Sequence, residues 1–282
     1  MPHRGLIAPI VLAAALCIAM ADARADDALY PTWSGGWTRV RDGKHGTWDP
    51  EKPRGLGQQA PLTPEYLARY QRNLADQEHG GQGENAGYLC LPHGMPRIMN
   101  GDHPLFFAVT PEATYIMRDI TDQFRRIYTD GRDWPARLQH SANGYSIGRW
   151  LDQDGGGRYD TLAIETRGVK NPHSYDSSGI PFHQDEAAVI KERLSIDKAD
   201  PQAMLDEITV IDHALTRPWT VTRTYRHVPD PKWIEYICAE DNHHVVIGKE
   251  DYLVSADGLL MPARKDQKPP DLRNFDLLNE QH

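Results

Sequence analysis

The chain has 282 residues, of which 25% are charged and 9% aromatic, and a formal net charge of −9 at pH 7. This length is compatible with one large domain or two small ones. The acidic balance disfavours nucleic acids and anionic membrane surfaces as partners, because both carry negative charge themselves.

Residues 1–25 have the pattern of a secretory signal peptide. A short basic start precedes an apolar run from Leu6 to Met20, and residues 23–25 (Ala-Arg-Ala) fit a small-residue cleavage site. The run is short for a bilayer span, which disfavours the alternative of an uncleaved anchor helix. We therefore predict a mature chain that begins near Asp26, has no membrane span and is periplasmic or secreted.

The three cysteines indicate one structural bond. Cys17 lies in the signal peptide, which leaves Cys90 and Cys238 as an even pair in an oxidising compartment. A disulfide between them would stabilise the fold by on the order of 5 kcal/mol in the chain-entropy model. Two buried thiols or a metal pair are the alternatives, and the metal pair is disfavoured because neither cysteine belongs to a C-x-x-C motif.

The N-terminal part of the mature chain predicts a long arm followed by a helix. Residues 26–60 are rich in Gly, Pro and Trp, and residues 35–37 form a G-x-W tripeptide, which opens the first strand in lipocalin-like barrels. A helix is predicted over residues 63–77, where Thr63 fits an N-cap and Pro64 the first helical position. Large side chains recur there at the four-residue spacing of a helix face.

From about residue 105 onward the sequence predicts strands. Nine runs are rich in Ile, Val, Thr, Tyr and Trp, at residues 106–109, 113–117, 124–129, 145–151, 159–166, 188–196, 204–211, 219–227 and 233–238. Short gaps without βαβ spacing favour an antiparallel sheet, closed as a barrel or bent into a two-sheet sandwich. We predict one mainly β domain over residues 26–262, similar to lipocalins in general plan, and a polar tail over residues 263–282.

A series of short motifs resembles a large family of uncharacterised exported bacterial proteins over residues 60–245. The motifs are C-x-P-x-G-x-P at 90–96, R-I-Y-x-D-G-R at 126–132, G-x-S-x-G-x-W at 144–150, Glu192-Arg193, an element from Asp212 to Trp219, and Y-x-C-x-E-x-N at 236–242. The resemblance implies export and supports the Cys90–Cys238 bond, and it implies no particular activity. The chain departs from the family after Trp150, where a Gly-rich insertion replaces a W-E-G-D-T-L run.

Two motifs that suggest catalysis have simpler interpretations. The G-x-S-x-G at residues 144–148 matches a nucleophile elbow, but the elbow needs a helix after the serine. Here the following residues predict a strand, so we interpret the motif as strand. Residues 130–132 (Asp-Gly-Arg) at a strand end predict a turn.

Three residues are candidates for acid–base catalysis. His183 is the first choice as general base, because histidine titrates near neutral pH and this one precedes a strand where a barrel would open. Glu165 and Glu192 are candidate catalytic carboxylates, with a structural ion pair as the alternative. The sequence contains no H-x-H, H-E-x-x-H or Cys/His cluster. We therefore predict neither a metal nor a cofactor, with coordination by histidines distant in sequence as the alternative.

Four residues are candidates for ligand binding. Arg126 and Arg132 could hold an anionic or carbonyl group with their forked donors. Tyr128 and Trp150 could line an aromatic pocket, although most aromatic residues in β proteins belong to the core.

These observations support three hypotheses of function. The first is an exported enzyme, a lyase, isomerase or hydrolase, that acts by general acid–base chemistry on a small molecule in a barrel cavity. The second is a non-catalytic periplasmic binding protein for a hydrophobic or aromatic compound. The third is an envelope protein with a structural or partner-binding role, which would expose an aromatic patch. The sequence leaves open whether the protein is an enzyme.

Overall fold

A computed structural model describes most of the chain from residue 29 onward. The described residues are 29–41, 44–53, 60–79, 83–85, 87, 91–101, 103–119, 123–236, 244–247, 249–254, 259–264 and 266–270. The predicted signal peptide, all three cysteines and the end of the predicted tail lie outside these residues. Among the described helices, none is long and apolar enough to cross a membrane.

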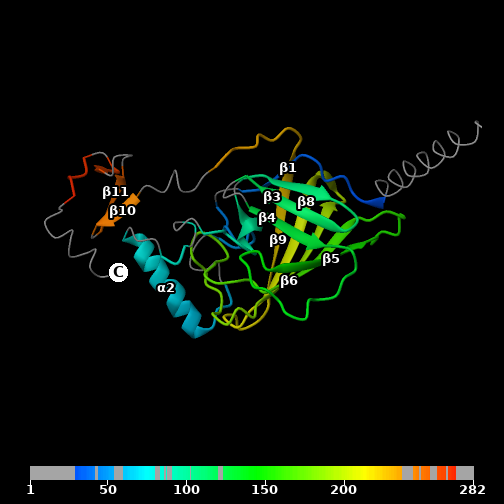
Figure 1. Ribbon diagram of the computed structural model, residues 1–282, viewed down its shortest axis with the longest axis horizontal. Helices are drawn as coiled ribbons and strands as arrows, with labels where there is room; N and C mark the ends of the chain where they lie inside the picture. The colour runs from blue at the N-terminus through cyan, green and yellow to red at the C-terminus, as the bar shows by residue number, and fades with distance from the viewer. Residues whose placement is uncertain are drawn as a thin grey trace, which may run out of the picture.

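Nine strands close into a β-barrel (Figure 1), as the sequence predicted. They are β1 (Gly36–Arg39), β2 (Leu105–Val109), β3 (Ala113–Arg118), β4 (Gln123–Tyr128), β5 (Tyr145–Leu151), β6 (Thr161–Arg167), β7 (Val189–Asp197), β8 (Asp200–Ile211) and β9 (Trp219–Val228). Each strand pairs with its neighbour in sequence, and β9 pairs back with β1 to close the barrel. The G-x-W tripeptide does begin the first strand, and its Trp37 is buried in the core.

One neighbouring pair departs from the predicted antiparallel arrangement. Strands β4 and β5 run parallel and are paired only at Ile127–Ser146 and Tyr128–Ile147. Residues 129–144 connect them, and a connection of this length returns the chain to the same end of the barrel before the next strand starts. The barrel is therefore mixed, with a short seam between β4 and β5.

Helix α2 (Pro64–Glu78) lies on the outside of the barrel, close to its predicted bounds (Figure 1). It packs against the β6–β7 connection, residues 168–188, through its buried side chains. The Tyr70 hydroxyl donates to Ser178 Oγ at 2.8 Å, and Asn73 Nδ2 donates to the Gly179 carbonyl at 3.2 Å. A short 3₁₀ helix, η3 (Arg97–Asn100), is also wholly buried.

The chain after β9 differs from the prediction. Residues 233–236 are described and form no strand, although the sequence predicted one over residues 233–238. Pro229 and Pro231 precede this run and have no backbone N–H to donate to a ladder. The N–H of Ile234 donates instead to Asp119 Oδ2 at 3.1 Å. Strands β10 (His244–Ile247), β11 (Glu250–Val254) and β12 (Leu260–Pro262) form a separate small antiparallel sheet, which the sequence did not predict.

Side chains fill the interior of the barrel. Apolar residues from β3 to β8 are 0% exposed there, namely Ile116, Ile127, Leu162, Ile190, Leu194, Met204, Ile208 and Val210. This core also encloses polar groups, which must find partners because burial removes them from water.

The central polar contact is an ion pair between Arg125 of β4 and Glu192 of β7. Two parallel bonds join them, Nη1 to Oε1 at 2.9 Å and Nη2 to Oε2 at 2.5 Å, and both side chains are at most 1% exposed. Arg125 also donates to Ser146 Oγ at 3.2 Å and to Thr166 Oγ1 at 2.8 Å. The guanidinium thus contacts β5 and β6 and reaches β7. Its two parallel bonds to Glu192 form a bidentate ion pair, which is the strongest form of such a contact.

Further interior side chains hold the segments that cover one end of the barrel. Arg118 donates to the Ile98 carbonyl at 3.0 Å, and Tyr225 donates to the Met99 carbonyl at 2.7 Å. Arg223 donates to the backbone carbonyls of Thr47 and Trp48. Burial lowers the pKa of both arginines to about 10, which still leaves them charged at neutral pH. We call the covering segments, residues 44–53 and 97–100, the end plug.

We expect Glu192→Gln to destabilise the protein by about 3–5 kcal/mol, because the variant removes the bidentate carboxylate partner of the buried Arg125 guanidinium. The free energy of unfolding in urea measures the effect. Glu165→Gln is the matched control, since Glu165 lies on the outer face of β6 and its partly exposed pair with Arg167 should contribute less than about 1 kcal/mol. Equal losses in the two variants would contradict a special role for the interior pair.

Candidate functional site

The predicted catalytic residues do not come together. Glu192 is inside the barrel and bound to Arg125, and Glu165 is on the outer face, 2.5 Å from Arg167 Nη2 and 3.9 Å from Lys191 Nζ. His183 belongs to the β6–β7 connection and is partly exposed. Because the interior is filled by side chains, the acid–base site expected in a barrel cavity is not assembled from these three groups.

Three predicted ligand-binding residues do come together, but on the outside of the barrel. The Arg126 guanidinium lies 5.6 Å and the Arg132 guanidinium 3.8 Å from the centre of the Tyr128 ring. Arg126 and Tyr128 line an open groove of about 510 Å³ over β4 and β5. Arg132 is also paired with Asp130 at 2.5 Å, within the turn that the sequence predicted. Here the cationic groups are already engaged by neighbouring rings or carboxylates.

Trp150 lies in another cluster, together with the N-terminal arm. Its ring centre is 5.0 Å from that of Trp33 and 5.7 Å from that of Tyr30. Trp33 is 2% exposed. The cluster attaches the arm to the end of β5, so the position of Trp150 fits the core alternative that the sequence left open.

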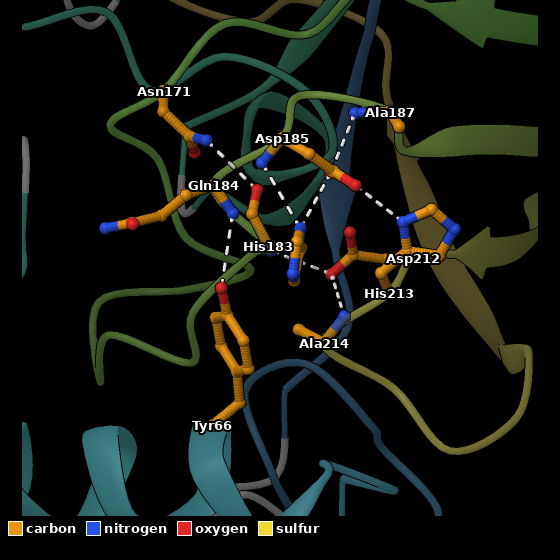
Figure 2. Close-up of polar contacts among 9 residues, drawn as sticks. All are labelled: Tyr66, Asn171, His183, Gln184, Asp185, Ala187, Asp212, His213 and Ala214. Atoms are coloured by element: carbon orange, nitrogen blue, oxygen red, sulfur yellow. Dashed lines mark hydrogen bonds and ion pairs between the residues drawn. The ribbon is translucent and has the colours of Figure 1, made fainter.

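The β6–β7 connection and the β8–β9 turn, residues 212–218, meet at His183 (Figure 2). Asp212 Oδ2 accepts the backbone N–H of His183 at 3.0 Å and that of Ala214 at 3.3 Å. This one carboxylate oxygen therefore holds the start of the β8–β9 turn and the β6–β7 connection next to each other. As a result His183 and His213, which are far apart in sequence, have ring centres 5.6 Å apart.

Asp185 lies between the two imidazoles. Its Oδ1 is 2.9 Å from His183 Nδ1, and its Oδ2 is 2.5 Å from His213 Nδ1. Partial burial opposes ionisation of Asp185, but the hydrogen bonds from His213 and from the Ala187 N–H outweigh it and lower the pKa of this carboxyl to about 2. The same contact raises the pKa of His213. We call His183, Asp185 and His213 the histidine–aspartate cluster.

Helix α2 supports this cluster from below. The Tyr66 ring centre is 5.2 Å from that of His183, and the Tyr66 hydroxyl accepts the N–H of Gln184 at 3.3 Å. Asn171 Nδ2 donates to the His183 carbonyl at 3.0 Å. Figure 2 shows these groups around the short segment that carries His183 and Asp185. The segment has little regular structure, so side-chain contacts determine its position.

A cavity of about 480 Å³ lies between helix α2 and the β6–β7 connection. It is lined by Arg69 of α2, by residues 83–85, by residues 171–173 and by Pro181, Phe182 and Gln184. Arg69 Nε donates to both carboxylate oxygens of Glu84, at 2.7 and 2.8 Å. Asn171 and Gln184 are part of the cavity wall. Asn171 also contacts His183 of the cluster, and Gln184 contacts Tyr66, which packs against His183, so the cavity and the cluster adjoin.

His173 is a buried member of the cavity wall. It is 7% exposed, its ring centre is 4.3 Å from that of Phe182, and its Nδ1 lies 2.9 Å from the Lys170 carbonyl. Because a carbonyl only accepts, Nδ1 carries the proton, and Nε2 is left with a lone pair. Nε2 is buried with no hydrogen-bond partner among the described residues. Burial lowers the pKa of His173 to about 4, so the ring is neutral at pH 7.

The sequence indicated His183 but not its partners. Asp185 follows at H-x-D spacing and was readable as a neighbour, whereas His213 belongs to another turn and is brought close only by the fold. His173 and Asp212 were not predicted as site residues, because their roles come from burial and not from a motif. Our expectation of no metal rested on motifs local in sequence, which cannot reveal such a cluster.

We expect the protein to lose stability on acidification because of His173. The unfolded chain takes up this proton near pH 6.5 and the folded chain near pH 4, so the unfolded state binds more protons between these values. The free energy of unfolding should therefore fall by about 2–3 kcal/mol between pH 7 and pH 4.5 on account of this residue. Urea unfolding at both pH values measures the change.

His173→Gln should lose less stability over this interval than the native chain, and His79→Gln, at the exposed end of α2, should lose as much as the native chain. An unchanged pH dependence in His173→Gln would contradict this account of the buried ring.

Comparison with known proteins found no protein-family model and no curated protein that matches the chain. The resemblance to exported bacterial proteins therefore stays a prediction, and the function is argued below from the geometry of the cavity and the cluster.

Proposed function

We propose that this is an exported small-molecule-binding protein whose ligand occupies the cavity between helix α2 and the β6–β7 connection. The proposal keeps the binding hypothesis drawn from the sequence and moves its location from the barrel interior to the outside of the barrel. Export through the predicted signal peptide and the Cys90–Cys238 bond belong to the same proposal and are supported by the sequence pattern.

The observation that carries the proposal is the position of the cavity among groups with perturbed pKa values. His173 is in its wall, and Asp185, Asp212 and His213 are in the adjoining segments, with pKa values shifted by burial or by mutual hydrogen bonds. Such groups are concentrated at ligand-binding and catalytic sites in proteins. A concave site with apolar walls and a few placed polar groups is the usual form of a small-molecule site.

Two features favour binding over acid–base catalysis. The predicted catalytic carboxylates Glu165 and Glu192 lie on the barrel, away from His183, and each is engaged in its own ion pair. Within the cavity wall, Arg69 and Glu84 neutralise each other at 2.7 Å. The wall therefore offers a neutralised pair and a shielded imidazole in place of a free acid and a free base.

The lining residues indicate the class of ligand. Exposed Pro172 provides apolar surface, next to the buried side chains of Pro181 and Phe182. Asn85, Asn171 and Gln184 provide amides that both donate and accept hydrogen bonds. A neutral ring compound with hydroxyl or carbonyl groups matches both kinds of surface. This class includes simple phenolic compounds and aryl glycosides, and it excludes highly charged ligands, which the neutral wall would not stabilise.

A thermal-shift screen with neutral phenolic compounds and aryl glycosides, followed by calorimetry on the hits, tests the proposal. A ligand that binds the folded state at 100 times its dissociation constant should stabilise the protein by about 2.7 kcal/mol. Gln184→Trp should abolish binding by filling the cavity, because Gln184 is an exposed residue that lines it.

Arg126→Ala is the matched control, since it alters the other groove, over β4 and β5. Loss of binding in Arg126→Ala with retention in Gln184→Trp would place the ligand in that outer groove and refute the proposed location. The absence of any stabilising ligand in the class would refute the proposed ligand chemistry.

A further inference from the structure

We propose that the histidine–aspartate cluster is a binding site for a divalent transition-metal ion, with Zn²⁺ as the best-matched ion. His183, Asp185 and His213 would supply three protein ligands, and a fourth position would remain for water. This inference is independent of the ligand proposed for the cavity, because its three residues do not line the cavity.

The ligand set and its spacing fit such an ion. Two imidazoles and one carboxylate are a common set for zinc with an open fourth position. One ligand atom from each residue lies within 4.8 Å of the others. Ligand atoms around a tetrahedral zinc ion lie about 3.3 Å apart, given metal–ligand distances near 2.0–2.1 Å. The exposed side chains of Asp185 and His213 would rotate to reach this spacing around the partly exposed His183.

The short contacts within the cluster bring electron-pair donors together. Asp185 oxygens lie 2.9 Å from His183 Nδ1 and 2.5 Å from His213 Nδ1. His183 Nδ1 also accepts the backbone N–H of Asp185 at 3.2 Å, so it presents its lone pair on the side where the Asp185 carboxylate lies. A single divalent ion satisfies both contacts at once, because neutral imidazole nitrogens and a carboxylate are all electron-pair donors to a metal.

Asp212 provides a second and independent indication. It is 7% exposed, and its Oδ1 is buried with no hydrogen-bond partner among the described residues. Figure 2 shows this oxygen directed toward the space between the His183 ring and the Asp185 carboxylate. A water molecule on the open metal position would donate to this oxygen. Asp212 Oδ2 meanwhile fixes the backbone at His183 and Ala214, as residues that support metal ligands commonly do.

The charge balance and exposure of the site also suit a divalent cation. The carboxylates of Asp185 and Asp212 face two imidazoles that are neutral when they bind a metal, so a charge of +2 would be balanced. Exposed fractions of 32% for His183, 34% for Asp185 and 71% for His213 leave a route for the ion from solvent. Mg²⁺ should bind poorly, because it prefers oxygen ligands in octahedral geometry.

Isothermal titration calorimetry of the chelator-treated, full-length protein with ZnCl₂ at pH 7 tests the site. We expect one equivalent of Zn²⁺ to bind, MgCl₂ to give no comparable heat, and Co²⁺ to produce the intense visible absorption of a tetrahedral site. His213→Ala and Asp185→Asn should each weaken Zn²⁺ binding at least tenfold. Circular dichroism establishes that the variants remain folded, which is expected because both side chains lie at the surface.

His140→Ala is the matched control, because His140 also pairs with a carboxylate on the same connection, that of Glu186 at 2.7 Å, but lies outside the cluster. It should bind Zn²⁺ like the native chain. Equal Zn²⁺ binding by the native chain and by His213→Ala would overturn the proposal, because the metal would then be held elsewhere. The absence of Zn²⁺ binding by the native chain would also overturn it and leave a hydrogen-bonded cluster only.

Discussion

The bidentate contact between Arg125 and Glu192 is the constraint on which the barrel depends. Strands β4 and β5 share only two paired positions, so backbone hydrogen bonds hold this seam weakly. The Arg125 side chain crosses the seam, bonds Ser146 on β5 and Thr166 on β6, and ends on Glu192 of β7. Because both charges are buried, moving them apart would leave each charge without a partner, at a high cost in free energy. It therefore fixes the register of four strands at the place where the ladder is shortest.

The same interior determines which parts of the molecule are open to ligands. Arg118, Arg223 and Tyr225 point inward and donate to backbone carbonyls of the end plug. Those carbonyls belong to segments without strand partners, so the buried donors satisfy groups that would otherwise be costly to bury. Polar side chains thus close one end of the barrel, and apolar side chains fill its interior around the Arg125–Glu192 pair. The proposed ligand site therefore lies outside the barrel, among loops held by a rigid scaffold, and such loops usually carry function.

The sequence predicted the architecture well and the facing of individual side chains poorly. Strand composition and turn residues are local signals, and they located α2 and β2 to β9 closely. The run Phe-Arg-Arg-Ile-Tyr at residues 124–128 has arginines on both faces, so alternation alone does not say which one points inward. We named Arg126 as a candidate for ligand binding, whereas Arg125 is the residue that points into the barrel. Its partner Ser146 lies on β5, beyond the long connection, so the sequence did not reveal this contact. The same one-residue offset separates Glu165, which is partly exposed on the outer face, from buried Thr166.

The parallel pairing of β4 and β5 escaped prediction for a related reason. Sequence gaps indicate how far the chain can travel, and residues 129–144 are sufficient for either a long hairpin or a return crossing. Residues 233–236 have strand composition and yet form no strand, because the prolines before them remove donors and no partner edge is offered. In both cases the outcome depends on which edge is available in three dimensions, and composition contains no such information.

The position of the candidate sites follows from how the β6–β7 connection is held. Its segment at residues 183–186 has no ladder of its own, and its bonds go to Asp212, Asn171 and the Tyr66 hydroxyl. Each of these partners comes from a different part of the fold: the β8–β9 turn, the connection itself and helix α2. Three independent supports fix His183 and Asp185 in place while their polar atoms still face solvent. The side chains of a barrel strand cannot combine these properties, because each points either into the filled core or out into solvent. A supported loop can instead bring two histidines and two carboxylates together at one point.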